Sequence, residues 1–209
     1  MLNLIYPILS KDDCVSQVIN KNLFLVKEHL GLFKAANNFD IFDPENGELI
    51  MECREPTLGL ITKLLRFTDF KRMTPFDVQI RTPDGSRIVR IKRGISLFLS
   101  NVEVFDENNE FIGGFKQRFL SIGGRFDVFG KKAEEICTLS GKWTGWDFYF
   151  KSEEREYAHV SKKWAGIGKE LFSSADNYIL EIAEDVKPDD DVRKLILAAV
   201  MCIDMVLKE

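Results

Sequence analysis

The run from Leu195 to Ile203 holds nine consecutive residues without a charge. An amphipathic surface helix would place a polar residue at every second or third position, so a helix here is apolar on every face and should be buried on every face. A membrane span needs about 20 apolar residues, whereas the run offers 13 even when it is extended through Asp204 to Leu207. The pattern therefore predicts a helix inside a protein and no stable membrane span.

Most of the chain before this helix consists of short alternating runs separated by polar turn residues. Each unit is an aromatic-rich strand, a turn and a return strand, which is typical of a β-hairpin. The predicted pairs are residues 39–42 with 48–54, 76–81 with 87–91, 102–105 with 111–118, 126–129 with 135–139, and 146–150 with 156–162. Because closure removes exposed strand edges, the sequence predicts a mainly β fold, a closed antiparallel β-barrel that encloses the hydrophobic C-terminal α-helix.

The remaining segments suggest one domain with a second, shorter helix. No low-complexity linker divides the chain, so a single domain over residues 1–209 is predicted. Residues 57–67 form the second predicted helix, with Thr57 as its N-cap. This helix places four apolar residues on one face, namely Leu58, Ile61, Leu64 and Leu65. Residues 162–173 fit either an irregular segment or a short helix.

The composition favours a large core and reduced thiols. The chain is 45% hydrophobic and holds 17 Phe, which is ample for the interior of a barrel. The cysteines are Cys14, Cys53, Cys137 and Cys202, and none forms a CxxC pair. This spacing fits neither a zinc site nor a disulfide framework. The N-terminus lacks the pattern of a signal peptide, so we expect a cytoplasmic protein, either free or peripheral at a membrane.

Charge is distributed unevenly along the chain. The net charge is −4, but residues 62–93 carry nine basic groups against three acidic ones, which leaves −10 for the rest. This +6 segment suggests an anionic partner. The alternative is that the basic side chains alternate outward along strands and are only solvated. No feature predicts binding to nucleic acid.

No catalytic motif occurs in the sequence. His29 and His159 are far apart, and both fall in strand-like runs, where a surface or core role is commoner than catalysis. The Gly113-Gly114 and Gly123-Gly124 pairs are not followed by helices, so they indicate strand bends or close backbone approach and not phosphate-binding loops. We therefore predict a protein that is not an enzyme.

Acidic residues before the last helix form the one candidate metal site. Asp176 and Asn177 lie in one loop, and Asp189, Asp190 and Asp191 stand at the start of the helix. Hard oxygen ligands of this kind are typical of calcium sites. The alternative is that the aspartates cap free N–H groups at the helix N-terminus and bind no ion.

Several segments resemble the phospholipid scramblase family in the same order along the chain. Residues 146–152 (WDFYFKS) resemble its D-F-E-I-K-S strand, and residues 160–167 (VSKKWAGI) resemble its I-S-K-x-W-x-G segment. Residues 174–178 (SADNY) resemble D-A-D-N-F, while residues 190–194 and 198–204 resemble the D-V-K-x-K and C-F-L-I-D region. Residues 105–113 (FDENNEFIG) resemble scramblases and LURP-one-related proteins more loosely.

The resemblance implies a tubby-like barrel of about twelve strands around a hydrophobic C-terminal helix. It also implies calcium-stimulated movement of phospholipids between leaflets and, by analogy with tubby proteins, binding of phosphoinositides. Ser174 stands where the family has a carboxylate, so a calcium site formed by Asp176, Asn177 and Asp189 to Asp191 is expected to be weak.

Two functional hypotheses follow from the sequence. In the first, a scramblase-related, non-enzymatic barrel engages anionic phospholipid headgroups through basic side chains. The lipid-binding candidates are Lys71, Arg72, Arg90, Lys92 and Arg93. In the second, the barrel is a soluble scaffold whose loops bind a protein partner, and lipids are irrelevant. An exposed apolar patch without a basic rim would favour the second hypothesis.

Overall fold

The structure is a computed structural model of the 209-residue chain. It describes residues 11–28, 38–57, 59–68, 73–96, 101–118, 125–142, 146–162, 177–188 and 190–207. The predicted element at residues 162–173 lies almost entirely outside these ranges.

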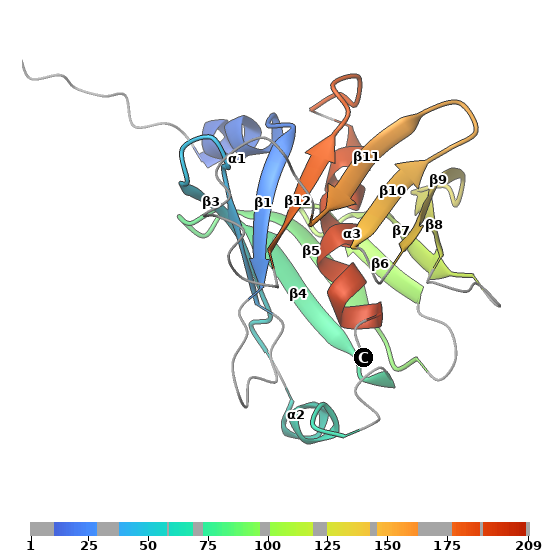
Figure 1. The fold of residues 1–209 in the computed structure, drawn as a ribbon. Coiled ribbons are helices and arrows are strands. Elements are labelled where there is room, and N and C mark those ends of the chain that lie inside the picture. Colours follow the sequence, from blue (N-terminus) through green and yellow to red (C-terminus); the bar gives the residue numbers. More distant parts are fainter. Residues whose placement is uncertain are drawn as a thin grey trace, which may run out of the picture.

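Twelve antiparallel strands form one closed barrel in which each strand pairs with its neighbours in sequence (Figure 1). They are β1 (Leu23–Glu28), β2 (Phe39–Phe42), β3 (Leu49–Arg54), β4 (Phe76–Arg81), β5 (Arg87–Arg93), β6 (Asn101–Phe105), β7 (Phe111–Gln117), β8 (Phe126–Gly130), β9 (Glu135–Lys142), β10 (Asp147–Lys151), β11 (Glu156–Ser161) and β12 (Asn177–Ile182). Pairing of β1 with β12, with Leu25 opposite Ile179, closes the barrel. The five predicted hairpins and the closed barrel are confirmed.

The strands show the alternation of a wall with one buried face. In β4 the side chains of Phe76, Val78 and Ile80 are buried, while those between them are half-exposed. The same period of two in β8 directs Phe126 and Val128 inward. Because successive strand residues point to opposite faces, the sequence pattern alone sets which residues fill the barrel.

Within the described ranges three helices accompany the barrel, and one of them occupies its interior. They are α1 (Lys11–Ile19), α2 (Leu60–Leu65) and α3 (Asp191–Leu207). Every residue from Leu195 to Ile203 is at most 3% exposed, and these side chains share one hydrophobic cluster with the inward side chains of the strands. Figure 1 shows α3 running through the barrel. The buried C-terminal helix is therefore confirmed.

Two adjacent glycines allow β7 to lie close to its neighbours. Gly113 has a φ of +144°, and a Cβ atom there would stand 2.2 Å from the carbonyl oxygen of Phe129. A Cβ atom on Gly114 would stand 2.1 Å from the carbonyl oxygen of Val102. The predicted close backbone approach at this pair is thus confirmed.

Arg193 joins the start of α3 to the N-terminal part of the chain. Its side chain is buried, and its guanidinium donates hydrogen bonds to the carbonyl oxygens of Ile19, Lys21 and Val186 at 2.7, 2.7 and 3.0 Å, and to the side-chain oxygen of Asn22. The acceptors of these hydrogen bonds are all uncharged oxygens. Because burial removes water from the charged group, the pKa of Arg193 is lowered.

The second predicted helix forms, but it starts later than expected and its described leucines face solvent. α2 begins at Leu60 after an N-cap at Gly59 that makes no side-chain cap bond, so the prediction of Thr57 as N-cap is wrong. Leu64 and Leu65 are 62% and 38% exposed. They face solvent because the barrel interior is already filled by α3, and α2 lies outside one end of the barrel (Figure 1).

The enclosed helix generates the first prediction. An Ile196→Asp or Val200→Asp substitution would bury a carboxylate where both wild-type side chains are 0% exposed. Each should cost at least about 3 kcal/mol, a large part of the stability of an ordinary domain. Urea unfolding followed by circular dichroism measures the effect.

The matched control is Ile95→Asp, because Ile95 is 76% exposed. That variant should change the free energy of unfolding by no more than about 0.5 kcal/mol. If the Ile196→Asp and Val200→Asp proteins were both as stable as the wild type, α3 could not be enclosed.

The second prediction concerns Arg193. An Arg193→Met substitution keeps the apolar stem but leaves buried carbonyl oxygens without a donor, and it should destabilise the fold by about 3 kcal/mol or more. An Arg193→Lys protein keeps the charge but lacks the fork that reaches several segments, so it should also be destabilised. Lys187→Met, at an exposed position, controls for the lost charge. Wild-type stability of Arg193→Met would contradict this role.

Candidate functional site

The basic residues predicted on β5 do not share one face of the barrel. Arg90 and Lys92 are half-buried on the outer face, with Ile91 directed into the core between them. Arg93 follows on the inward side and is only 4% exposed. Lys71 and Arg72 lie outside the described residues. The structure therefore brings Arg90 and Lys92 together and separates Arg93 from them.

The outward pair stands among acidic and aromatic neighbours. Arg90 donates to both carboxylate oxygens of Asp77 at 2.9 and 2.6 Å, and this bidentate hydrogen bonding raises the pKa of Arg90. Lys92 lies 5.6 Å from the ring centre of Phe105 and is paired in the strand register with Glu103. Neighbouring carboxylates thus offset part of the positive charge of this face, and Arg90 already has a partner.

Arg93 is held at the end of the barrel interior. Its guanidinium donates to the carbonyl oxygen of Thr74 at 2.5 Å and lies 4.7 Å from the ring centre of Phe76. Burial lowers the pKa of Arg93, because the charged form loses water. Arg93 lines a groove with Lys92 and Gly94, but its small exposed fraction offers little surface to a headgroup.

The predicted calcium ligands are divided between the two ends of β12. Asn177 is the first residue of β12, whereas Asp190 and Asp191 follow the turn after Ile182. The strand between Asn177 and Ile182 spans about 17 Å, whereas calcium ligands lie within about 2.6 Å of the ion. Asp176 and Asp189 lie outside the described residues. Within the described part of the chain, the structure does not bring Asn177 together with the two aspartates, and weak calcium binding stays a prediction.

The two described aspartates have different environments at the start of α3. The carboxylate of Asp190 accepts a hydrogen bond from the backbone N–H of Val192 at 3.0 Å, which is an N-cap contact. Asp191 lines a groove of about 400 Å³ beside Lys131 and Glu134. Partial burial, more than any neighbouring charge, raises the pKa of Asp191.

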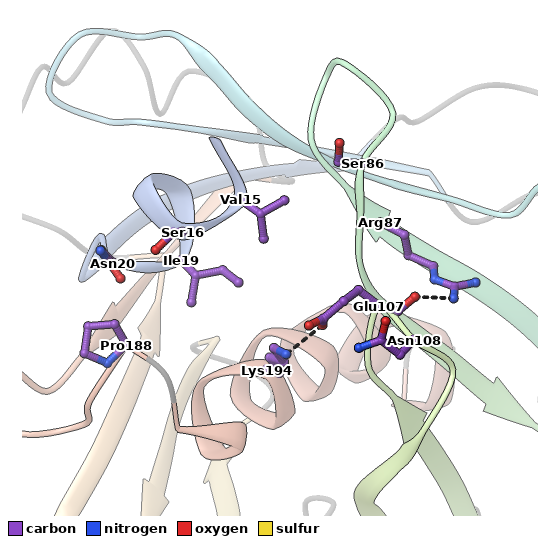
Figure 2. Close-up of a pocket in the computed structure, with 10 residues that line it drawn as sticks. All are labelled: Val15, Ser16, Ile19, Asn20, Ser86, Arg87, Glu107, Asn108, Pro188 and Lys194. Carbon is purple, nitrogen blue, oxygen red and sulfur yellow. Dashed lines mark hydrogen bonds and ion pairs between the residues drawn. The ribbon is translucent and has the colours of Figure 1, made fainter. Parts of the chain in front are cut away.

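A wider cleft opens at the end of the barrel where α3 begins (Figure 2). Its volume is about 980 Å³, and it lies between α1, the β4–β5 turn, the β6–β7 turn and the first turns of α3. Lys194 forms an ion pair of 2.7 Å with Glu107, and Arg87 donates to the Glu107 carbonyl oxygen at 2.6 Å. Sequence reasoning missed this cleft because its walls come from separate segments that share no motif.

His159 lies beside a carboxylate on the outer face of the wall. Its Nε2 atom is 2.6 Å from the Asp147 carboxylate, and its ring stacks on that of Tyr149 at 4.3 Å. The His159 and Asp147 side chains are 29% and 45% exposed, whereas the next residue in each strand, Val160 and Phe148, is buried. This geometry is that of a surface pair between β10 and β11. His29 lies outside the described residues.

The cap at Asp190 generates the third prediction. Asp190→Ala removes the acceptor for the Val192 N–H and should lower stability by about 1 kcal/mol, whereas Asp190→Asn keeps a good cap and should cost much less. Both values should be the same without calcium and with micromolar calcium in thermal unfolding, because a weak site stays empty at that concentration. A stabilisation by micromolar calcium that Asp190→Asn abolishes would instead assign these carboxylates to an ion.

Comparison with known proteins gives one family match and several distant relatives. The Scramblase family model matches residues 8–209. A phospholipid scramblase family protein of Schizosaccharomyces pombe is 21% identical over 83% of this chain and 47% of its own length. Phospholipid scramblase 2 of Homo sapiens is 23% identical over 66% of this chain and 51% of its own length. The chain thus spans about half the length of the curated relatives it matches.

A solved structure supports the fold independently. An X-ray structure of a protein from Arabidopsis thaliana matches 91% of this chain and 95% of its own, with a TM-score of 0.51 and 15% identity. The barrel of twelve strands with its C-terminal helix is the tubby-like fold that the resemblance implied. Among the described residues, no helix is both long enough and apolar enough to cross a membrane. Because the family model covers nearly the whole sequence, the chain belongs to the Scramblase family.

Proposed function

We propose that this domain engages anionic phospholipid headgroups at a membrane surface and catalyses no covalent reaction. Membership of the Scramblase family is the observation that carries the proposal. The +6 charge of residues 62–93 supports it, because this segment includes β4, β5 and most of α2. A peripheral contact on the cytoplasmic side would agree with the cysteine content of the sequence.

The expected strength of this contact depends on which cations are available. Among the residues that the structure describes, Lys92 and the exposed Lys63 are the candidates for headgroup binding. Lys71 and Arg72, which lie outside the described residues, are further candidates from the sequence. Each basic group near an anionic bilayer contributes about 1 kcal/mol. Arg90 must exchange the Asp77 carboxylate for a phosphate, so its net contribution should be smaller. The result is a salt-sensitive, reversible association.

The fourth prediction tests this association with vesicles. Binding in co-sedimentation should rise with the phosphatidylserine content of phosphatidylcholine vesicles and fall as salt screens the charges. Lys92→Gln should weaken binding about fivefold, the equivalent of about 1 kcal/mol. Lys132→Gln is the matched control and should bind like the wild type, because Lys132 is exposed in the turn between β8 and β9, outside the basic segment and at the barrel end remote from α2.

Binding that ignores both lipid charge and salt would contradict the electrostatic proposal. Absence of any vesicle binding, together with specific capture of a protein by the barrel loops, would favour the scaffold hypothesis.

A further inference from the structure

The short helix α2 presents its apolar side to solvent. Leu60 and Leu64 are four residues apart and therefore share one face of the helix. They are 75% and 62% exposed, and Phe67, in the turn that follows α2, is 54% exposed. In a surface helix of a soluble protein, such a stripe would instead face the core.

The polar side of the same segment faces the barrel. Arg66, at the C-cap of α2, donates to both carboxylate oxygens of Glu55 at 2.5 and 2.7 Å, and the two side chains are 4% and 1% exposed. Arg66 also donates to the carbonyl oxygen of Pro75 at 3.0 Å. Rolling the helix to bury its leucines would break this ion pair and leave a buried charge, which is strongly unfavourable. The outward direction of the apolar stripe is thus built into the fold.

A second segment adds another apolar side chain at the same end of the barrel. Ile95, just after β5, is 76% exposed. The backbone N–H of Ser96 donates to the carbonyl oxygen of Met73 at 3.2 Å, which joins this loop to the segment that follows α2. A groove of about 370 Å³ connects Thr57 and Thr62 with Lys92 and Gly94. We call the set Leu60, Leu64, Leu65, Phe67 and Ile95 the apolar tip.

The two segments that carry the apolar tip hold basic but no acidic residues, although Asp77 and Glu103 line the adjacent groove beside Lys92. The sequence holds no Asp or Glu between Glu55 and Asp69, and none between Arg93 and Glu103. Lys63 is exposed on α2, whereas Glu55 is buried in its pair with Arg66. A second copy of the chain would bring the same positive charge to an isologous contact. The combination of projecting apolar side chains and basic neighbours fits an anionic lipid surface, which accepts Leu, Ile and Phe at its interface without a shaped pocket.

We propose that the apolar tip inserts into the interfacial region of an anionic membrane and sets the barrel end-on to the bilayer. This inference rests on the proposed lipid contact and adds its hydrophobic part and its orientation. Figure 1 shows α2 beyond the barrel end opposite α1, so the cleft beside α1 would face away from the membrane. The outer basic side chains would then reach headgroups at the rim of the contact, while the apolar tip lies deeper.

Vesicle binding by tip variants tests the inserted side chains. Leu60→Ser combined with Leu64→Ser should weaken binding to phosphatidylcholine–phosphatidylserine vesicles by about tenfold or more, since each fully buried leucine is worth at least a factor of about ten. The matched control is Leu49→Ser, a 37% exposed leucine at the start of β3, the end of that strand remote from α2. Urea unfolding should be nearly unchanged in all these proteins, because the substituted side chains are exposed.

Insertion can be measured directly with a polarity-sensitive fluorophore attached to the introduced thiol of a Leu64→Cys protein that also carries Cys14→Ser. Cys53, Cys137 and Cys202 are buried, so the introduced thiol is the one expected to react. The probe should shift to the blue on the same vesicles and be quenched by spin-labelled lipid, whereas a probe on Leu49→Cys should do neither.

The outcomes separate this inference from the proposed function. If the wild type binds these vesicles but the probe at position 64 stays in water and the double serine variant binds equally well, the apolar tip is not inserted and only the electrostatic contact stands. If the wild type binds no vesicles, the proposed function fails and the inference fails with it. A blue shift without vesicles that grows with protein concentration would overturn the inference in favour of self-association.

Discussion

The barrel depends on the apolar helix that fills it. An eight-stranded barrel has an interior that strand side chains fill by themselves, and barrels of about 16 strands leave a channel. With twelve strands, this barrel needs additional apolar volume, and the residues from Leu195 to Ile203 supply it. A remaining space of about 10 Å³ beside Ala199 and Ile203 is hardly large enough for one water molecule. In the folded state the closed barrel and the buried helix therefore depend on each other.

Arg193 connects the enclosed helix to the N-terminal part of the chain. The helix α3 follows β12 in the chain, and its first turn is tied to carbonyl groups near the end of α1 and the start of β1. A neutral side chain could not satisfy four acceptors from two segments at once, and a lysine lacks the planar fork. The same buried guanidinium thus links the register of the β1–β12 closure to the position of α3.

A filled barrel restricts where function can be located. The interior offers no room for a ligand beside Ala199 and Ile203, so binding must use the outer wall, the two ends or the loops. The outer wall carries ion pairs such as Arg90 with Asp77, which lower its net charge. The two ends differ in character: one has the cleft between α1 and α3, and the other has α2 with its apolar side outward. This polarity of the barrel is the basis for proposing an end-on membrane contact.

The sequence alone determined the features that are local in period or composition. Strand alternation and turn residues predicted the five hairpins, a uniformly apolar run predicted the enclosed helix, and ordered short segments identified the family. The same alternation also predicts that Arg93 points to the opposite face of the strand from Arg90 and Lys92. The selection of all three as lipid-binding candidates overlooked this.

Only the tertiary structure decided features that depend on what else occupies the core. Since α3 fills the barrel, the apolar face of α2 has no core to enter, and the Arg66–Glu55 pair turns that face to solvent. Likewise, β12 is an extended strand, so it holds Asn177 far from Asp190, although the sequence suggested one loop with two acidic ends. Periodicity predicts which residues share a face of a helix or strand. Whether that face points to the core or to solvent depends on which element fills the core and on where buried charges find their partners.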